Sequence, residues 1–228
     1  MHPGPAAPAT PTGAHDDPLA RIHAAGVVPV IAIDDADAAQ PLADILADTG
    51  LGCIEVTLRT EAALSALRSI TARTDLLAGA GTVLEPDDVE RCIAAGARFI
   101  VSPGFDTAVV ERCQNLGVPV LPGTATATEV LHARRHGLRA VKFFPAETAG
   151  GLTAITSIAA AIPDVRFMPT GGVGPDNLRH YLSTPAVLAA GASWMAPRNL
   201  LAAHDWTEIR ARCAHAAHLV AETRRPTR

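Results

Sequence analysis

The feature that most constrains the fold is a repeating unit, in which a helical stretch ends, a short link follows and an apolar strand begins. Gly26, Gly50, Gly96, Gly117 and Gly137 stand at five of these junctions, where glycine suits the left-handed end of a helix. The apolar runs predict strands at 28–33, 53–57, 76–79, 99–102, 118–121, 140–144, 166–170 and 187–190.

The stretches between these strands have the start signals and polarity of helices, such as the capping box Thr126-x-x-Glu129. The pattern predicts helices at 17–25, 36–48, 60–74, 86–95, 107–116, 127–136, 151–162, 176–183 and 206–221. Strands that alternate with helices in this way are parallel and are joined by crossover helices.

Two architectures of the α/β class fit this alternation. An open doubly wound sheet is expected to have a glycine-rich turn after its first strand, but the residues there are Asp34-Asp35-Ala36-Asp37. We therefore expect a closed (β/α)8 TIM barrel, formed as a single domain by residues 17–221. The Pro- and Ala-rich residues 1–16 are expected to be a flexible leader, and residues 222–228 a flexible tail.

The composition excludes several classes of partner. A formal charge of −4 over 228 residues, without long basic runs, argues against nucleic acid or an anionic membrane as a partner. The four scattered cysteines are typical of reduced thiols in a cytoplasmic protein. His132 and His136 lie four residues apart, but no acidic ligand pattern surrounds them, so we expect no metal site.

Lys142 is the only lysine of the chain, and it lies inside the apolar run of residues 140–144. Arginine could supply a positive charge there, but it cannot lose its proton or act as a nucleophile. Removing an ammonium group from water favours the neutral amine, which is the form that attacks a carbonyl carbon. The alternative is a structural lysine that reaches solvent or pairs with Glu147.

Barrel enzymes carry their chemistry at the C-terminal ends of the strands, and polar groups gather there in this sequence. Period-2 alternation places Glu55 and Arg59 on the same face of the second strand, where Glu55 is a candidate general base or acid. A purely structural Glu55–Arg59 ion pair is the alternative. Gly171 and Gly172 follow the seventh strand, where barrels often bind phosphate through backbone N–H groups.

Taken together, these motifs resemble the 2-keto-3-deoxy-6-phosphogluconate (KDPG) and 4-hydroxy-2-oxoglutarate (KHG) aldolases over about residues 19–220. The resemblance rests on EVTLRT at 55–60, GAGTV at 79–83, SPG at 102–104, KFFPAE at 142–147, PTGGV at 169–173 and SW at 193–194. Ala192 stands before Ser193 where many relatives have glycine.

The resemblance implies a class I lyase without a metal or other cofactor, in which Lys142 forms a Schiff base and Glu55 transfers protons. It implies that Arg59 and Thr82 hold the pyruvyl carboxylate, and that Phe144 forms a wall beside the imine. The phosphate would be bound by Gly171, Gly172 and Ser193, with Thr170 near the acceptor end. It further implies a homotrimer that binds a phosphorylated 2-keto acid and releases pyruvate.

Several alternatives remain open at this point. The substrate could be the galactonate epimer or KHG, because residues 122–128 vary from the common family pattern. A phosphosugar isomerase or epimerase barrel could share the phosphate site and use Glu55 as its base. A barrel that only binds a phosphorylated metabolite is the non-enzymatic alternative.

Overall fold

The computed structural model describes residues 17–224, so the predicted leader and residues 225–228 of the predicted tail lie outside the described residues. The last helix, α10 (Trp206–Thr223), includes Glu222 and Thr223, which we had assigned to the tail. Among the residues described, no helix is both long enough and apolar enough to cross a membrane.

All the strand pairs in this structure are parallel, as the alternation predicts. The strands are β1 (Val27–Ile31), β2 (Cys53–Thr57), β3 (Leu77–Gly81), β4 (Ile100–Val101), β5 (Val120–Leu121), β6 (Gly123–Thr124), β7 (Ala140–Phe143), β8 (Arg166–Pro169) and β9 (Ala190–Ala192). They form a six-stranded sheet of order β5-β4-β3-β2-β1-β9 and a three-stranded sheet of order β6-β7-β8. The chain therefore has an α/β fold with a curled parallel sheet.

The two sheets differ from the single closed sheet that we expected, and the residues at the breaks explain why. Only Pro122 separates β5 from β6, and proline has no N–H group to donate to a neighbouring strand. Its carbonyl still accepts a hydrogen bond from the Lys142 N–H at 3.0 Å. On the other side, β8 meets the last strand region through two isolated parallel bridges, Phe167↔Val187 and Thr170↔Gly191.

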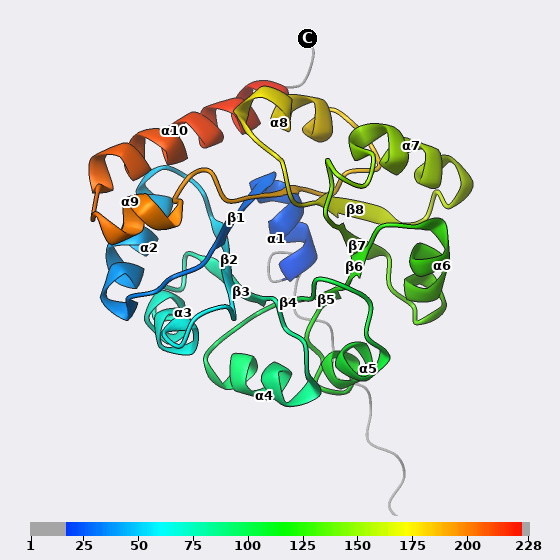
Figure 1. Cartoon of the computed structure of the whole chain (residues 1–228), viewed down its shortest axis with the longest axis horizontal. Helices are drawn as coiled ribbons and strands as arrows, with labels where there is room; N and C mark the ends of the chain where they lie inside the picture. Colours follow the sequence, from blue (N-terminus) through cyan, green and yellow to red (C-terminus); the bar gives the residue numbers. More distant parts are fainter. Residues whose placement is uncertain (1–16, 225–228) are drawn as a thin grey trace, which may run out of the picture.

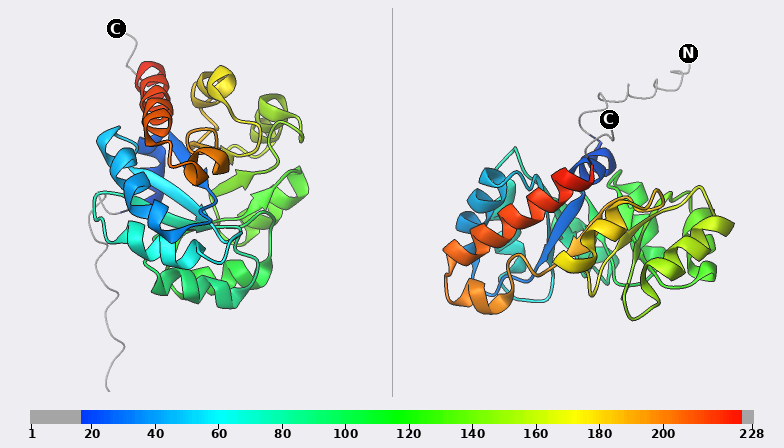
Figure 2. Two further views of the ribbon diagram at one scale, coloured as in Figure 1. Left: turned by 60° about the vertical axis from the view of Figure 1, so that its left-hand side comes forward. Right: turned by 90° about the horizontal axis from the view of Figure 1, so that it is seen from above.

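Helices surround the strands on all sides in the view of Figure 1. They are α2 (Ala39–Asp48), α3 (Ala63–Thr71), α4 (Pro86–Ala94), α5 (Thr107–Asn115), α6 (Ala127–Arg135), α7 (Gly151–Ala161), α8 (Pro175–Leu182) and α10, with the short 3-10 helix η1 (Ala36–Ala38) before α2. Two further helices, α1 (Pro18–Ala25) and α9 (Arg198–Ala202), lie at opposite ends of the molecule in the right-hand view of Figure 2. The helix α9 was not predicted from the sequence.

Short polar residues fix where the helices begin. The Asp106 carboxylate accepts a hydrogen bond from the Val109 N–H at 2.9 Å and so caps α5. The predicted capping box of α6 is present, because the Glu129 N–H donates to the Thr126 hydroxyl and the Glu129 carboxylate accepts from the Thr126 N–H. Both capped helices directly follow strands, since α5 comes after β4 and α6 after β6.

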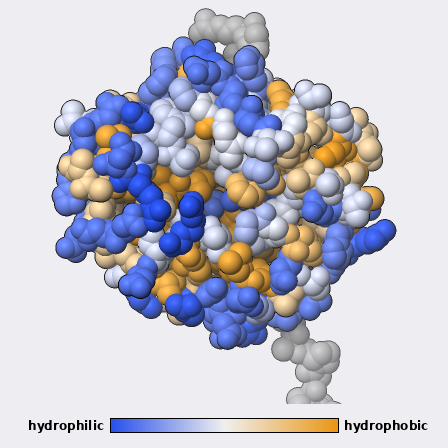
Figure 3. All heavy atoms as spheres, in the orientation of Figure 1, coloured by the Kyte–Doolittle hydropathy of each residue, from blue (hydrophilic) through white to orange (hydrophobic). Residues whose placement is uncertain are grey.

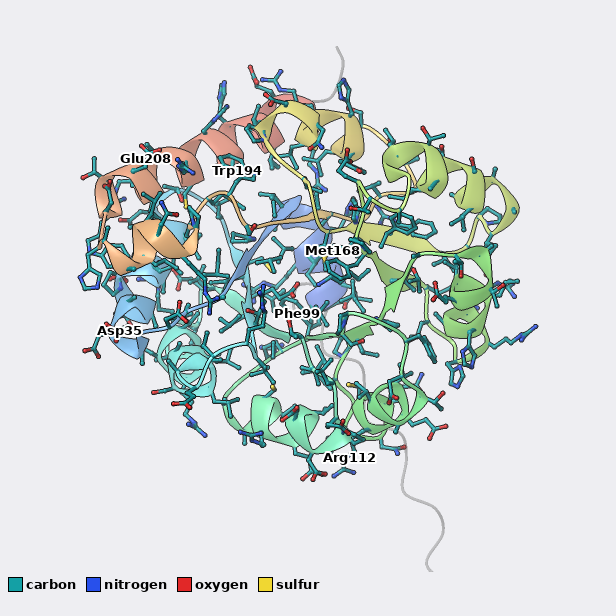
Figure 4. The ribbon with its side chains drawn as sticks, in the orientation of Figure 1. Asp35, Phe99, Arg112, Met168, Trp194 and Glu208 are labelled. Atoms are coloured by element: carbon teal, nitrogen blue, oxygen red, sulfur yellow. The ribbon has the colours of Figure 1, made fainter. Side chains whose placement is uncertain are left out.

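The core has two parts. The larger cluster packs the outer faces of the strands against the helices, and the smaller one joins inward-facing strand residues to Ile22 of α1. Phe99 and Met168 belong to the smaller cluster, and Figure 4 shows them inside the ring of strands, whereas Asp35 and Arg112 lie at the outer edge. These apolar side chains therefore fill the ring towards the N-terminal ends of the strands. Polar groups on the inward faces can gather only nearer the C-terminal ends.

Candidate active site

The Lys142 amine and the Glu55 carboxylate meet inside the ring of strands. Lys142 Nζ lies 3.4 Å from Glu55 Oε1, and the two residues are only 5% and 0% exposed. Strand β2 pairs with β1 and β3, and β7 pairs with β6 and β8, so this contact crosses the interior instead of following a ladder. A buried amine is thereby placed beside a group that can exchange protons with it.

The Glu55 carboxylate lies directly over the backbone of β3. A Cβ built at Gly81 would lie 1.9 Å from Glu55 Oε1 and 2.6 Å from its Cδ, so a side chain at residue 81 would displace the carboxylate. Glu55 Oε2 is buried and has no hydrogen-bond partner among residues 17–224. Leaving a buried acceptor unpaired is costly, which is typical of a group that binds a substrate or a proton.

A cavity of about 350 Å³ opens beside this pair at the C-terminal ends of the strands. Six of the predicted site residues line it, namely Arg59, Phe144, Thr170, Gly171, Gly172 and Ser193. The Phe144 ring, 36% exposed, joins the cavity to the amine, because its centroid lies 5.3 Å from Lys142 Nζ. Lys142, Glu55 and Thr82 are not part of the lining.

The charges in the lining favour an anionic ligand. Its charged residues are Arg59 and Arg198, both exposed, and no acidic residue contributes to it. Arg198 Nη2 donates to Asp34 Oδ1 at 2.7 Å, but an ion pair this exposed adds little stability and can exchange for another anion. Figure 3 shows apolar residues around the middle of this face, with strongly hydrophilic side chains among them as well as at the edge.

Sequence reasoning missed two residues with polar side chains that line the cavity. Thr57 lies two residues after Glu55 on the same face of β2, and the period-2 pattern could have identified it. Arg198 begins α9, and no motif marked that short helix.

Backbone conformation distinguishes Thr82 and the turn after β8. Thr82 has a φ of +58°, which is rare for a β-branched residue and costs about 1–3 kcal/mol. Gly171 and Gly172 have φ values of +99° and +81°, which glycine adopts without this cost. Strained backbone of the kind seen at Thr82 is typical of functional sites.

All four cysteines of the chain are buried and form no disulfide. Burial raises the pKa of Cys92, Cys113 and Cys213 to about 12, so these thiols remain protonated near neutral pH. Residues 17–224 contain no group of three or more His, Cys, Asp or Glu side chains that could hold a metal ion.

Comparison with known proteins decides the family. The family model for aldolases, described as KDPG and KHG aldolase, matches residues 19–212. A 2-dehydro-3-deoxy-phosphogluconate aldolase from Treponema pallidum is 45% identical over 186 residues, which are 81% of this chain and 89% of that protein.

The chain belongs to the KDPG and KHG aldolase family.

Solved structures of KDPG aldolases have the same fold. The enzyme of Zymomonas mobilis ZM4, solved with 3-phosphoglycerate, has a TM-score of 0.84 and 37% identity, over 90% of this chain and 96% of that one. The Legionella pneumophila enzyme, solved with pyruvate captured at low pH as a covalent carbinolamine intermediate, has a TM-score of 0.84 and 38% identity, over 88% of this chain and 98% of that one.

The contact between Gly81 and Glu55 gives a first prediction for this family member. Gly81→Ala should push the Glu55 carboxylate away from Lys142. It should lower kcat by about 100-fold, because a displaced carboxylate no longer contributes general acid–base catalysis to the reaction. Over-packing should also cost about 1–3 kcal/mol of unfolding free energy. Steady-state kinetics and urea unfolding measure the two effects.

Gly52→Ala is the matched control, because a Cβ at Gly52 meets no atom within 4 Å. It should leave kcat close to the wild-type value. A wild-type kcat in Gly81→Ala would contradict the position assigned to the carboxylate.

Proposed function

We propose that this protein is a class I aldolase that cleaves KDPG to pyruvate and glyceraldehyde 3-phosphate through a Schiff base on Lys142. The observation that carries the proposal is the single lysine of the chain, buried with its amine 3.4 Å from the Glu55 carboxylate. The family assignment supports the same chemistry. Isomerase, epimerase and non-enzymatic barrels need no such buried amine.

The first steps build the imine. The neutral Lys142 amine attacks the C2 carbonyl carbon of the substrate, and a proton delivered to the oxygen gives a carbinolamine. Loss of water then leaves a protonated imine. Glu55 is the group beside the amine that can take up and return these protons. The ring of Phe144 lies beside the amine and limits the access of water to it.

The protonated imine then accepts the electron pair of the C3–C4 bond. As that bond breaks, the C4 hydroxyl becomes the aldehyde of glyceraldehyde 3-phosphate, and its proton passes to Glu55 directly or through a water molecule. The enamine left on Lys142 takes a proton at C3, and hydrolysis of the imine releases pyruvate and the free amine. The unpartnered Glu55 Oε2 supports its assignment as the acceptor of the C4 proton.

The two anionic ends of the substrate match the two kinds of anion site around the cavity. Arg59 would bind the C1 carboxylate with two hydrogen bonds and turn C2 toward the amine, with the Thr82 hydroxyl as a further donor. Gly171, Gly172 and Ser193 would bind the phosphate, and Thr170 would lie near the acceptor carbons. Arg198 adds a positive charge to this lining.

KHG is a second candidate substrate, because the matching family model covers both activities. KHG has a carboxylate in place of the phosphate-bearing tail, and Arg198 is a charged partner that could bind it. The galactonate epimer of KDPG differs only at C4, and it belongs to the same proposal.

We also propose that the two sheets form one closed (β/α)8 barrel, in a single domain from residue 17 to residue 221. The two isolated bridges between β8 and the last strand region support closure, as does the separation of β5 and β6 by Pro122 alone. We propose a cytoplasmic location, which is supported by four buried cysteines that form no disulfide. We propose a homotrimer as well, which is supported by the family resemblance.

The Lys142→Arg variant tests the proposed function. It keeps a positive charge in the ring, but a guanidinium cannot form the imine, so cleavage of KDPG should fall to the detection limit. Pyruvate formation measured with lactate dehydrogenase and NADH reports turnover. Thermal unfolding of the same sample checks that the variant is folded.

The same assay on the wild type should give a higher kcat/KM for KDPG than for its galactonate epimer or KHG. Turnover by Lys142→Arg would exclude the Schiff base, and a wild type without lyase activity on any of the three would exclude the aldolase.

Glu55→Gln separates proton transfer from binding. The amide keeps the shape of the carboxylate but cannot accept the C4 proton, so kcat should fall by about 10²- to 10⁴-fold. The pyruvate concentration that half-saturates imine formation should change by much less. A variant that lost pyruvate binding but kept kcat would assign Glu55 to binding instead.

A further inference from the structure

The segment that follows β7 supports the glycine turn that follows β8. The Ala146 N–H donates to the Thr170 carbonyl at 2.8 Å, and the Glu147 N–H donates to the Gly171 carbonyl at 3.1 Å. These two bonds attach the end of the Lys142 strand to the turn. A shift of the turn would therefore move the residues that follow Lys142, and a shift of those residues would move the turn.

The Glu147 side chain lies directly against Gly172. A Cβ built at Gly172 would be 2.5 Å from Glu147 Cγ and 2.7 Å from Glu147 Cβ, so the side-chain stem fills the space that another residue at 172 would need. Glu147 does not line the 350 Å³ cavity. It lines a separate cavity on the outer side of the turn, together with Gly151, Asn177 and Tyr181.

Tyr181 of α8 holds the carboxylate in that outer position. Its hydroxyl donates to Glu147 Oε1, and the residue is only 1% exposed. Burial first, and then the hydrogen bond to Glu147, raise the pKa of Tyr181, so the phenol keeps the proton that it donates.

A second residue on the same face of α8 binds the turn itself. Asn177 lies one helical turn before Tyr181, and its Nδ2 donates to the Gly172 carbonyl at 3.0 Å. Asn177 Oδ1 accepts from the Gly174 N–H at 2.9 Å. The helix thus fixes the backbone of the turn through Asn177 and the neighbouring carboxylate through Tyr181.

The position of this carboxylate matters because the turn is the proposed phosphate site. An anion bound by the N–H groups of Gly171 and Gly172 would be repelled by a carboxylate turned toward it. The stem of the Glu147 side chain packs against Gly172. The conformation of this side chain therefore sets the position of the negative charge relative to the turn.

We propose that Tyr181 positions the Glu147 carboxylate on the outer side of the Gly171–Gly172 turn, and that this pair thereby raises the affinity of the site for the phosphate of the substrate. Both are positioning residues, since neither lines the substrate cavity. The inference rests on the proposed function, because it takes the turn to bind the phosphate of KDPG.

Tyr181→Phe removes the hydroxyl and keeps the ring in the core. The released carboxylate should raise the KM for KDPG about tenfold, a loss of about 1.4 kcal/mol of binding. The value of kcat should change less than twofold. The pyruvate concentration that half-saturates borohydride trapping should stay the same, because pyruvate has no phosphate. Ser183→Ala, which removes a hydroxyl that donates to the Arg179 carbonyl at the end of α8, is the control and should change neither value.

Two substitutions of Glu147 itself test the charge without touching the core. Glu147→Asp keeps the charge but is too short to reach Tyr181, so it should raise the KM for KDPG as Tyr181→Phe does. Glu147→Gln keeps an acceptor for Tyr181 and removes the charge, so its KM should stay within about twofold of the wild type. In the Tyr181→Phe background, Glu147→Gln should restore most of the lost affinity.

The outcomes separate this inference from the proposed function. A wild type that does not cleave KDPG overturns the proposed function and this inference with it. An active wild type whose KM is unchanged in both Tyr181→Phe and Glu147→Asp overturns the inference alone. So does a Tyr181→Phe/Glu147→Gln variant no better than Tyr181→Phe, or a Tyr181→Phe variant that weakens pyruvate trapping as much as KDPG binding.

Discussion

The contact between the Lys142 amine and the Glu55 carboxylate is the interaction on which the rest of the site depends. Both groups are almost completely buried, and each compensates the other for the loss of water. Removing one partner of such a pair leaves an uncompensated polar group, which typically costs about 3–5 kcal/mol. A purely structural protein would gain as much from apolar residues of the same volume, so the pair is better explained by chemistry than by stability.

The curled parallel sheet makes this contact possible. Glu55 and Lys142 come from strands that do not pair with each other, and only curvature brings their inward faces within reach. Towards the N-terminal ends of the strands, the ring is filled by apolar side chains such as Phe99 and Met168. Solvent therefore reaches Glu55 and Lys142 only from the C-terminal ends of the strands. Substrate and catalytic groups therefore meet at one end, where the loops also supply Arg59 and the glycine turn.

Much of the fold could be predicted from the sequence, because most of its strands are continuous apolar runs and its helices have local caps. The prediction was exact at residues 53–57 for β2 and correct at the start of β7 and β8. It was wrong at the last strand, which begins at Ala190 instead of residue 187, because small residues such as Gly191 and Ala192 carry little periodic signal. Pro122 and the short helix α9 are further local features that apolar patterning does not report.

The site was predictable where one residue stands out chemically, and less so where tertiary structure brings exposed residues together. A lone lysine in an apolar strand identified Lys142, and alternation on β2 identified Glu55. Arg198 was missed because its place beside the cavity depends on how α9 packs. The Glu147–Tyr181 hydrogen bond joins residues 34 apart in the chain, and the sequence alone contains no pattern that links them.

The central claim is that one amine forms an imine with the substrate, and borohydride reduction in the presence of pyruvate tests it most directly. Reduction should attach one carboxyethyl group to Lys142, found by mass spectrometry on the tryptic peptide 140–166, which trypsin no longer cuts after residue 142. Because Lys142 is the only lysine, the α-amino group is the only other primary amine of the chain, and it serves as an internal control. An unmodified intact mass, or an adduct only on the α-amino group, would contradict the account.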